Sequence, residues 1–257
     1  MKSIRTQNEA VALIYESYNR AKQREINGLK AKKNKQHAQT LLNMVGNPDK
    51  GQDIVLVTGS KGKGSTAAFI SSLLTQAGYK TGLFTSPHLL SFNERIQIEG
   101  KAIPNADFVR LANDVQPFVK QLQRRLRVNE YLGPIAVNLA IAMLYFAENE
   151  VDYIILEVGK GGLDDDTNVV SNKWAVITHI FEEHVAELGP TLSHIITHKL
   201  GIIKEQTEST VVAKQQPHND RLIKQRLAKS TATHFGHDYS IEFVKTSLSG
   251  ATVHINT

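Results

Sequence analysis

A glycine-rich segment, residues 59–66, contains the side chains best suited to chemistry. It reads Gly-Ser-Lys-Gly-Lys-Gly-Ser-Thr and lies between an apolar β-branched run, residues 54–57, and a run with helical spacing, residues 67–74. A strand that turns through glycines into a helix leaves backbone N–H groups facing outward, where anions bind. Lys63 adds a cation for terminal phosphates, and the Ser65 hydroxyl suits Mg²⁺. The segment favours nucleotide phosphate binding over an ordinary glycine-rich turn.

A second group of polar side chains follows a later apolar run, residues 151–156, which we predict to be a strand. Glu157 comes directly after this run. A carboxylate at a strand tip beside a phosphate loop is what Mg²⁺ requires, since the ion prefers oxygen ligands and bridges to phosphates. The acidic run Asp164–Asp166 follows shortly afterwards. We interpret it as a solvated loop tip rather than a second metal site.

The elements that must position these residues are strands that alternate with helices. Predicted strands cover residues 54–57, 81–85, 151–156 and 175–180, long helical stretches cover 106–127 and 135–148, and a closing β pair covers 238–244 and 251–255. This alternation predicts an α/β fold, with a mostly parallel central sheet and helices on both faces. In such sheets the chemistry lies beyond the carboxyl ends of the strands, where the segments described above fall.

The composition limits the classes of protein to which the chain can belong. At 257 residues, 41% hydrophobic and 21% charged, we expect a globular protein with a sizeable core. The absence of cysteine excludes disulfides and thiolate metal sites and suits a cytoplasmic location. No signal peptide is visible, and no run approaches the ~18 apolar residues of a membrane span. The net charge of +5 fits phosphate or polycarboxylate ligands without requiring nucleic acid.

We divide the chain into an N-terminal helical segment, residues 1–40, and a nucleotide-binding domain, residues 41–257. Residues 8–30 have apolar side chains that recur on one face of a helix. The basic run Arg20–Lys35 lacks the interleaved aromatics typical of nucleic-acid sites. We therefore interpret it as a solvated helix face or linker.

The phosphate loop is shorter than a strict Walker A loop, which has four residues between its first glycine and Gly-Lys-Ser/Thr. Only two residues separate the first two glycines here, and a third glycine precedes the serine. This G-x-x-G-K-G-S pattern resembles the ATP loop of the Mur ligase superfamily, and most of all that of the folylpolyglutamate synthase/dihydrofolate synthase family. The resemblance implies a P-loop NTPase-like domain whose ATP-binding residues are Gly59, Ser60, Lys61, Gly62, Lys63, Gly64, Ser65 and Thr66.

Further motifs extend the resemblance from about residue 41 to residue 214. Residues 85–96 contain Thr-Ser-Pro-His-Leu and then Phe-Asn-Glu-Arg-Ile. They are similar to a family loop that lies by the phosphate site and the pterin end of the substrate. The implied substrate residues are Ser86, Pro87, His88, Phe92 and Arg95.

Residues 157–168 are similar to the family's Glu-Val-Gly-Leu-Gly-Gly-Arg and Asp-Ala-Thr-Asn, with Leu163 in place of the arginine. The match implies that Glu157 is a metal ligand and that Asn168 contacts the nucleotide. Where the family has Asp-His this chain has Glu183-His184, and the resemblance makes His184 a metal ligand.

Lys199 stands where the family has a lysine that CO₂ converts to a carbamate, a carboxylate-like metal ligand. Thr191 is the expected N-cap of the helix that contains it. The resemblance thus implies ATP and two Mg²⁺ ions as cofactors, with the ions held by Ser65, Glu157, His184 and carbamylated Lys199.

The resemblance implies an ATP-dependent ligation in which Lys63, His184 and Lys199 have catalytic roles. ATP phosphorylates a carboxylate to an acyl phosphate, and the amine of glutamate then displaces phosphate to form an amide. The implied partners are ATP, a folate-like or other carboxylate, and glutamate, with neither nucleic acid nor a membrane.

Three functions remain open from the sequence. The first is an amide ligase of the folylpolyglutamate type, and the second is a Mur-type ligase for another carboxylate, since Leu163 and Ala136 replace family residues. The third is a truncated, non-catalytic ATP-binding module. The family's His-Gln-x-x-Asn segment and C-terminal ligase domain have no counterpart in these 257 residues. We therefore expect an ATP-binding domain that works with a C-terminal domain in cis or in trans.

Overall fold

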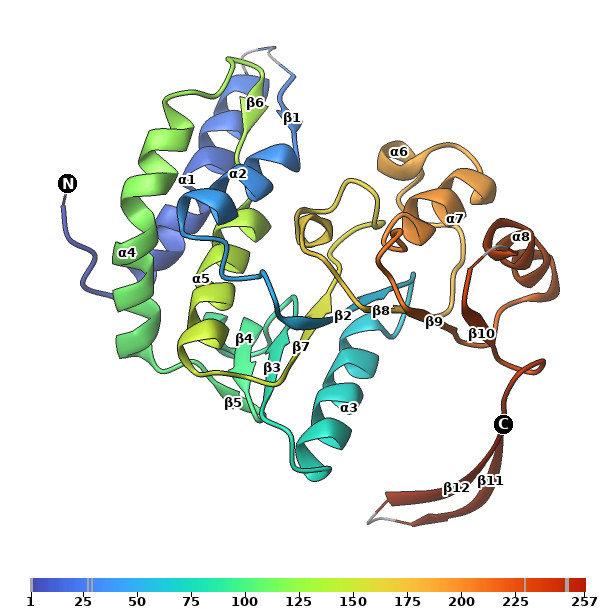
Figure 1. Cartoon of the computed structure of the whole chain (residues 1–257). Helices are drawn as coiled ribbons and strands as arrows, with labels where there is room; N and C mark the ends of the chain where they lie inside the picture. The colour runs from blue at the N-terminus through green and yellow to red at the C-terminus, as the bar shows by residue number, and fades with distance from the viewer. Residues whose placement is uncertain (1, 27, 29, 229, 248–249) are drawn as a thin grey trace.

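An eight-stranded sheet forms the centre of the computed structural model, which describes residues 2–26, 28, 30–228, 230–247 and 250–257 (Figure 1). The strand order is β10-β9-β8-β2-β7-β3-β4-β5. The six strands from β10 to β3 are parallel, and β4 and β5 continue the sheet antiparallel. The strands are β2 (Asp53–Thr58), β3 (Thr81–Phe84), β4 (Ile96–Ile98), β5 (Lys101–Ala102), β7 (Tyr153–Glu157), β8 (Trp174–Ile177), β9 (Ser209–Val212) and β10 (Ala232–His234).

Two small strand pairs lie outside this sheet. The first joins β1 (Lys32–Lys33) to β6 (Glu130–Tyr131) in parallel, and the second joins β11 (Ser240–Ser247) to β12 (Gly250–Asn256) as an antiparallel hairpin. The hairpin extends away from the rest of the molecule (Figure 1). It confirms the predicted closing β pair.

Helices cover both faces of the central sheet, as predicted. They are α1 (Gln7–Ile26), α2 (Gln36–Met44), α3 (Lys63–Gln76), α4 (Asn105–Gln123), α5 (Pro134–Glu148), α6 (Val185–Leu188), α7 (Leu192–Leu200) and α8 (Pro217–Leu227), and two 3₁₀ turns cover Phe92–Arg95 and Asp166–Val169. In Figure 1, α1, α2, α4 and α5 form one layer, whereas α3 lies on the opposite side of the sheet.

The alternation of side chains along β2 shows why two layers form. Ile54 and Leu56 are fully buried in the large hydrophobic core shared with α1, α2, α4 and α5. Val55 and Val57 lie in a smaller core with Ala67 of α3. Successive residues of a strand point to opposite faces of the sheet, so this all-apolar strand requires cover on both sides.

The helix ends differ from the sequence prediction by a few residues. Helix α1 ends at Ile26, and residues 27 and 29 of the predicted stretch 8–30 lie outside the described residues, whereas α4 ends at Gln123 rather than at 127. Helix α2 is followed by Gly46 and Asn47, both at positive φ. Among the described residues, no helix combines the length and the apolar character that crossing a membrane requires.

Candidate functional site

The predicted functional segments meet at one edge of the sheet. Strands β3, β7, β2 and β8 are parallel neighbours, so their carboxyl ends lie side by side. The phosphate loop, residues 59–66, follows β2, and Glu157 is the last residue of β7. Ser86 comes shortly after β3, and His184 comes after β8. The sheet therefore gathers four segments that are widely separated in sequence.

The phosphate loop packs against the end of β8 through contacts that depend on Gly59. Its φ is +146°, and a Cβ there would lie 1.8 Å from Thr178 Oγ1, so only glycine fits. The Thr178 hydroxyl donates to the carbonyl of Lys61 at 2.8 Å. The N–H of Ser60 donates to the carbonyl of His179 at 2.9 Å. These bonds connect the phosphate loop to the end of β8.

Helix α3 begins inside this loop. Gly62 is its N-cap, in the left-handed conformation with φ 82°, and Lys63 is its first helical residue. The first N–H groups of a helix have no partner within the helix and lie at the positive end of its dipole. Lys63 and the start of α3 therefore present positive charge and N–H donors at the same point.

A cavity of about 440 Å³ opens beside the start of α3. Its lining includes Gly62, Lys63, Gly64, Ser65, Ser86 and Glu157. Residues predicted to bind phosphate, metal and substrate thus share one cavity.

Glu157 is the acidic group of this cavity. Its carboxylate accepts a hydrogen bond from the N–H of Ser86 at 2.8 Å, and a Cβ on Gly64 would come within 3.1 Å of it. Burial raises the pKa of Glu157, and the Ser86 amide and Lys63 oppose this only in part. Burial disfavours the charged form of a carboxylate, and a nearby cation stabilises that charged form.

The residues around Glu157 fit a magnesium ion. The Ser65 hydroxyl and the Glu157 carboxylate are hard oxygen donors that face the same cavity, and Mg²⁺ in nucleotide sites takes one or two carboxylates together with phosphate oxygens. Within the described ranges, no three histidine or acidic side chains cluster closely enough to form a metal site.

An ion pair between a buried lysine and a half-buried glutamate lies beyond the end of β8. Lys199 of α7 is only 1% exposed, and its Nζ donates to Glu183 Oε1 at 2.8 Å and to the carbonyl of Gly59 at 2.7 Å. Burial lowers the pKa of Lys199, although Glu183 opposes it. Burial alone would raise the pKa of Glu183, but Lys199 outweighs it and holds this pKa below its ordinary value. His184 Nε2 lies 3.8 Å from Glu183 Oε2.

The loop after β7 corrects the prediction for the acidic run. Asp164 is exposed, but Asp165 and Asp166 are 2% and 1% exposed, so the run is not a solvated loop tip. Asp165 accepts hydrogen bonds from the N–H and the hydroxyl of Thr167. Asp166 pairs with Lys33 of β1 at 3.6 Å, and burial raises its pKa to about 6. The sequence pattern failed because the cover comes from β1 and α5, far away along the chain.

The predicted substrate residues separate into two groups. Ser86 and Pro87 line the cavity with the phosphate loop. His88, Phe92 and Arg95 instead pack against one another: Arg95 Nε donates to His88 Nδ1 at 3.1 Å, and the guanidinium lies 4.7 Å from the centre of the Phe92 ring. The structure therefore does not bring these three side chains into the cavity lining.

Asn168 lies away from the cavity. Its amide donates to the carbonyl of Gly201 at 2.9 Å and more weakly to that of Leu163 at 3.4 Å. These bonds connect the loop after β7 to the end of α7. The structure therefore places Asn168 where it joins two segments of the site, rather than with the residues of the phosphate loop.

Sequence reasoning missed the contributions of Thr178 and Glu183. Thr178 touches Gly59 and Lys61, as described above, and its position near the end of the predicted strand 175–180 was the available signal. The family resemblance marks Glu183 only as a substitution for aspartate, although an acid beside a histidine after a strand is itself a signal. Its partner Lys199 lies sixteen residues further along the chain, so only the fold reveals the pair.

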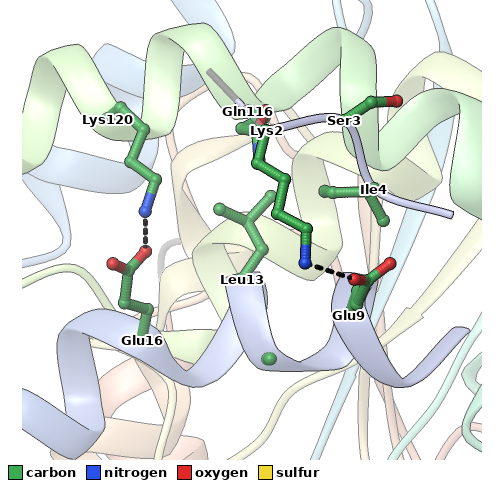
Figure 2. A pocket seen from close by; sticks show the side chains of 9 residues that line it. Lys2, Ser3, Ile4, Glu9, Leu13, Glu16, Gln116 and Lys120 are labelled. Atoms are coloured by element: carbon green, nitrogen blue, oxygen red, sulfur yellow. Dashed lines mark hydrogen bonds and ion pairs between the residues drawn. The ribbon is translucent and has the colours of Figure 1, made fainter. Parts of the chain in front are cut away.

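A second groove, away from the phosphate loop, is lined by residues that stabilise helices. This groove of about 360 Å³ lies at the surface between α1 and α4. Figure 2 shows its lining, where Lys2 pairs with Glu9 and Lys120 pairs with Glu16. Glu9 also accepts hydrogen bonds from the N–H groups of Arg5 and Thr6 before α1. Glu9 thus caps the N-terminus of α1, as in a capping box, and Glu16 links α1 to α4.

Comparison with known proteins agrees with this geometry. The family model of the Mur ligase middle domain matches residues 117–256, more than half of the chain. The chain belongs to the Mur ligase family. Within this family it is 40% identical over 195 residues to the dihydrofolate synthase/folylpolyglutamate synthase of Bacillus subtilis (strain 168), covering 75% of this chain and 44% of that protein. It is 38% identical over 165 residues to the folylpolyglutamate synthase of Lacticaseibacillus casei, covering 64% and 38%.

Solved structures of Mur ligases show the same fold. A complex of folylpolyglutamate synthase with AMPPCP and folate matches with a TM-score of 0.82 at 30% identity, over 96% of this chain and 60% of that chain. The resemblance inferred from the sequence motifs is confirmed. This Mur ligase chain spans less than half the length of the two curated relatives.

Proposed function

We propose that this chain is the nucleotide-binding part of an ATP-dependent carboxylate–amine ligase that adds glutamate to a folate or dihydropteroate through an acyl phosphate. The observation that supports this most is the single cavity that Lys63, Ser65, Ser86 and Glu157 share at the ends of adjacent strands. The similar proteins are named for this activity, and one of them has been solved with AMPPCP and folate. A cytoplasmic location and a C-terminal domain in cis or in trans belong to the same proposal.

Each residue of the cavity has a role that follows from its chemistry. Lys63 and the N-terminus of α3 bind and orient the phosphates of ATP. Ser65 and Glu157 would hold Mg²⁺, which supplies neutralisation of the phosphate charge. His184, at the end of β8, would hold a second ion. The Ser86–Pro87 segment borders the same cavity, so the carboxylate substrate enters from that side.

A second candidate is a Mur-type ligase for a carboxylate other than folate. The family resemblance places an arginine at Leu163 and a glutamate at Ala136. Here Leu163 is an exposed apolar side chain and Ala136 is 1% exposed within the core. Two charged groups are therefore missing, one from the loop after β7 and one from the first turn of α5, which favours a different acid.

Titration calorimetry tests the nucleotide site. ATP with Mg²⁺ is titrated into the chain, into Lys63→Ala, and into Lys101→Ala, which removes an exposed lysine of β5. We expect Lys63→Ala to weaken binding by about 10- to 100-fold, because a charge-assisted hydrogen bond contributes roughly 1.5–3 kcal/mol. Lys101→Ala should bind as the wild type does. A folded wild-type chain that binds no ATP would contradict the proposal.

Incorporation of isotope-labelled glutamate tests the reaction. The chain is assayed with dihydropteroate, with a folate and with a panel of other carboxylates, each alone and after addition of a separate C-terminal ligase domain. Product with folates supports the first candidate, and product only with another acid supports the second. If nucleotide binds but no acid is ligated under either condition, the chain is a nucleotide-binding module and the ligase proposal is wrong.

A further inference from the structure

The N-terminus of α5 lies beside the loop after β7 and has no acidic group of its own. Its N-cap is Gly133, and the first turn, residues 134–137, which the structure describes in full, contains no acidic residue. The free N–H groups at the start of a helix carry partial positive charge, and a nearby carboxylate stabilises them. Ala136 is the third residue of α5, from which a glutamate reaches back to the N-cap in a capping box. The family resemblance places a glutamate there.

Asp166 brings a carboxylate to this helix end from the loop after β7. A Cβ on Gly133 would lie 2.2 Å from Asp166 Oδ2, so the carboxylate lies directly against the N-cap, and only a residue without a side chain allows this approach. Where the family pattern reads Asp-Ala-Thr-Asn, this chain has aspartate at 166 instead of the alanine. The chain therefore has its carboxylate on the loop and its alanine on the helix, at residue 136.

Lys33 of β1 holds the same carboxylate from a third segment. Its Nζ lies 3.6 Å from Asp166 Oδ1, and the side chain of Asp166 is 1% exposed, against 29% for that of Lys33. Burial raises the pKa of Asp166 to about 6, while Lys33 and the N–H of Ala136 oppose this shift. Within the described ranges, neither Asp166 oxygen makes a hydrogen bond of normal geometry, so the carboxylate is held mainly by positive charge. A buried charge that lowers stability can still specify one arrangement of the chain.

The loop that Asp166 anchors joins residues of the candidate site. It begins directly after Glu157, and the N–H of Leu163 donates to the carbonyl of His198 in α7 at 2.7 Å. The amide of Asn168 bonds the residue that follows α7 at 2.9 Å. One end of the loop thus starts at the acid of the cavity, its middle contacts α7, and Asp166 fixes its far end to α5 and β1. A displaced Asp166 would therefore shift the loop that connects Glu157 to α7.

We propose that Asp166 is a positioning residue of the site. Paired with Lys33, it fixes the loop after β7 against the N-terminus of α5, and it acts through Glu157 and α7 rather than on a substrate. The N-terminal segment, which contains Lys33, thereby helps to shape the site, although none of its described residues lines the cavity. The inference deepens the proposed function and rests on it only for the effect on ATP, since the position of the loop is measured without a ligand.

Hydrogen exchange measured by mass spectrometry reports on the loop directly. We expect Asp166→Ala to speed exchange at least ~10-fold across residues 158–170, while exchange in α4, the internal reference, stays unchanged. Asp164→Ala is the matched control, because this neighbouring acid has a side chain that is 72% exposed, and it should exchange as the wild type does. Unchanged exchange in the loop, or an equal increase in α4, would overturn the proposal.

The contribution of Lys33 is tested by the same measurement. We expect Lys33→Met to speed exchange in residues 158–170, because it leaves the buried carboxylate without its cation. Lys33→Arg keeps the charge and should restore wild-type exchange, and Lys32→Met makes the same change at the exposed neighbour in β1. Equal exchange in Lys33→Met and Lys32→Met would refute the role of the pair.

Ala136→Glu tests whether Asp166 occupies the place of a capping glutamate. The new carboxylate would compete with Asp166 for one helix end and one lysine, so we expect faster exchange in the loop. Ala136→Gln has the same shape without the charge and should have a much smaller effect. In the Asp166→Ala background the two substitutions should act equally, because the competitor is gone. Equal effects of Ala136→Glu and Ala136→Gln in the wild-type background would show that bulk, not charge, disturbs the loop, and would refute the assignment.

Calorimetry with ATP and Mg²⁺ on the same samples connects the loop to the site. We expect Asp166→Ala and Lys33→Met to bind ATP several-fold more weakly than the wild type, and Lys33→Arg to bind it equally well. Wild-type affinity in variants whose loop exchanges faster would overturn the positioning role. A wild-type chain that binds no ATP would contradict the proposed function instead, and the exchange measurements would still decide whether Asp166 holds the loop.

Discussion

The phosphate loop after β2 and the group at the end of β8 contribute to one site but are built in different ways. The loop is a continuous segment, residues 59–66, and its donors are largely backbone N–H groups fixed by glycine geometry. The group at the end of β8 consists of side chains from separate segments, joined by the ion pair of the half-buried Glu183 with the buried Lys199. One half depends on local conformation, and the other depends on tertiary contacts.

The phosphate loop and the group at the end of β8 should be sensitive to different kinds of mutation. A backbone-built site is sensitive to any residue that alters φ or adds a Cβ, whereas a side-chain-built site is sensitive to the loss of one charged partner. The two halves also touch, since Lys199 donates to the carbonyl of Gly59. The β8 group therefore supports the first residue of the loop.

The largest effect is expected from Gly59→Ala. The added Cβ would clash with Thr178 at 1.8 Å, so we expect nucleotide binding to fall at least ~100-fold and the free energy of unfolding to drop by about 4 kcal/mol. Gly62→Ala is the matched control, because its φ is also positive but no atom lies within 4 Å. It should lower stability by only about 1–2 kcal/mol. Urea unfolding and calorimetry measure both, and equal effects would contradict the role of Thr178.

Lys199→Met tests the side-chain half. Removing this buried cation leaves Glu183 and the Gly59 carbonyl without their donor, and we expect a loss of about 3–4 kcal/mol in urea unfolding. Lys101→Met, at an exposed position, should change stability by less than about 0.5 kcal/mol. If the two variants are equally stable, the buried pair does not hold the β8 group together.

Asp166→Asn tests the buried charge in the loop after β7. The pKa of Asp166 rises from 3.8 when unfolded to about 6 when folded, so the wild type loses stability as pH rises through this interval. We expect the stability difference between wild type and variant to change by up to ~3 kcal/mol between pH 4 and pH 7, in favour of the variant at pH 7. Thermal unfolding across this range measures it. A difference that is independent of pH would contradict the burial of a titrating Asp166.

The smallest effect is expected from Thr191→Ala, which alters the helix that positions Lys199. The Thr191 side chain caps α7 by accepting from the N–H of His194. Its loss should lower the free energy of unfolding by about 1 kcal/mol, as for other N-caps. Thr191→Ser, which keeps the hydroxyl, should recover most of the loss. Failure of Thr191→Ser to do so would show that the methyl group, not the cap, is what matters.

The strand-to-helix turn, the parallel sheet and the N-cap at Thr191 were all predictable from the sequence. Each depends on residues close together in the chain: glycines before a helix, β-branched runs of strand length, and a threonine before an apolar helix. The alignment of functional segments with strand ends followed from the same local patterns, because parallel strands place their carboxyl ends on one edge.

Three features were not predictable: the burial of Asp165 and Asp166, the exclusion of His88, Phe92 and Arg95 from the cavity lining, and the pairing of Glu183 with Lys199. The sequence by itself determined which segments fold locally and which residue types stand at the strand ends. Only the tertiary structure decided which of those side chains are covered and which meet, because burial and ion pairing depend on segments that approach from far along the chain.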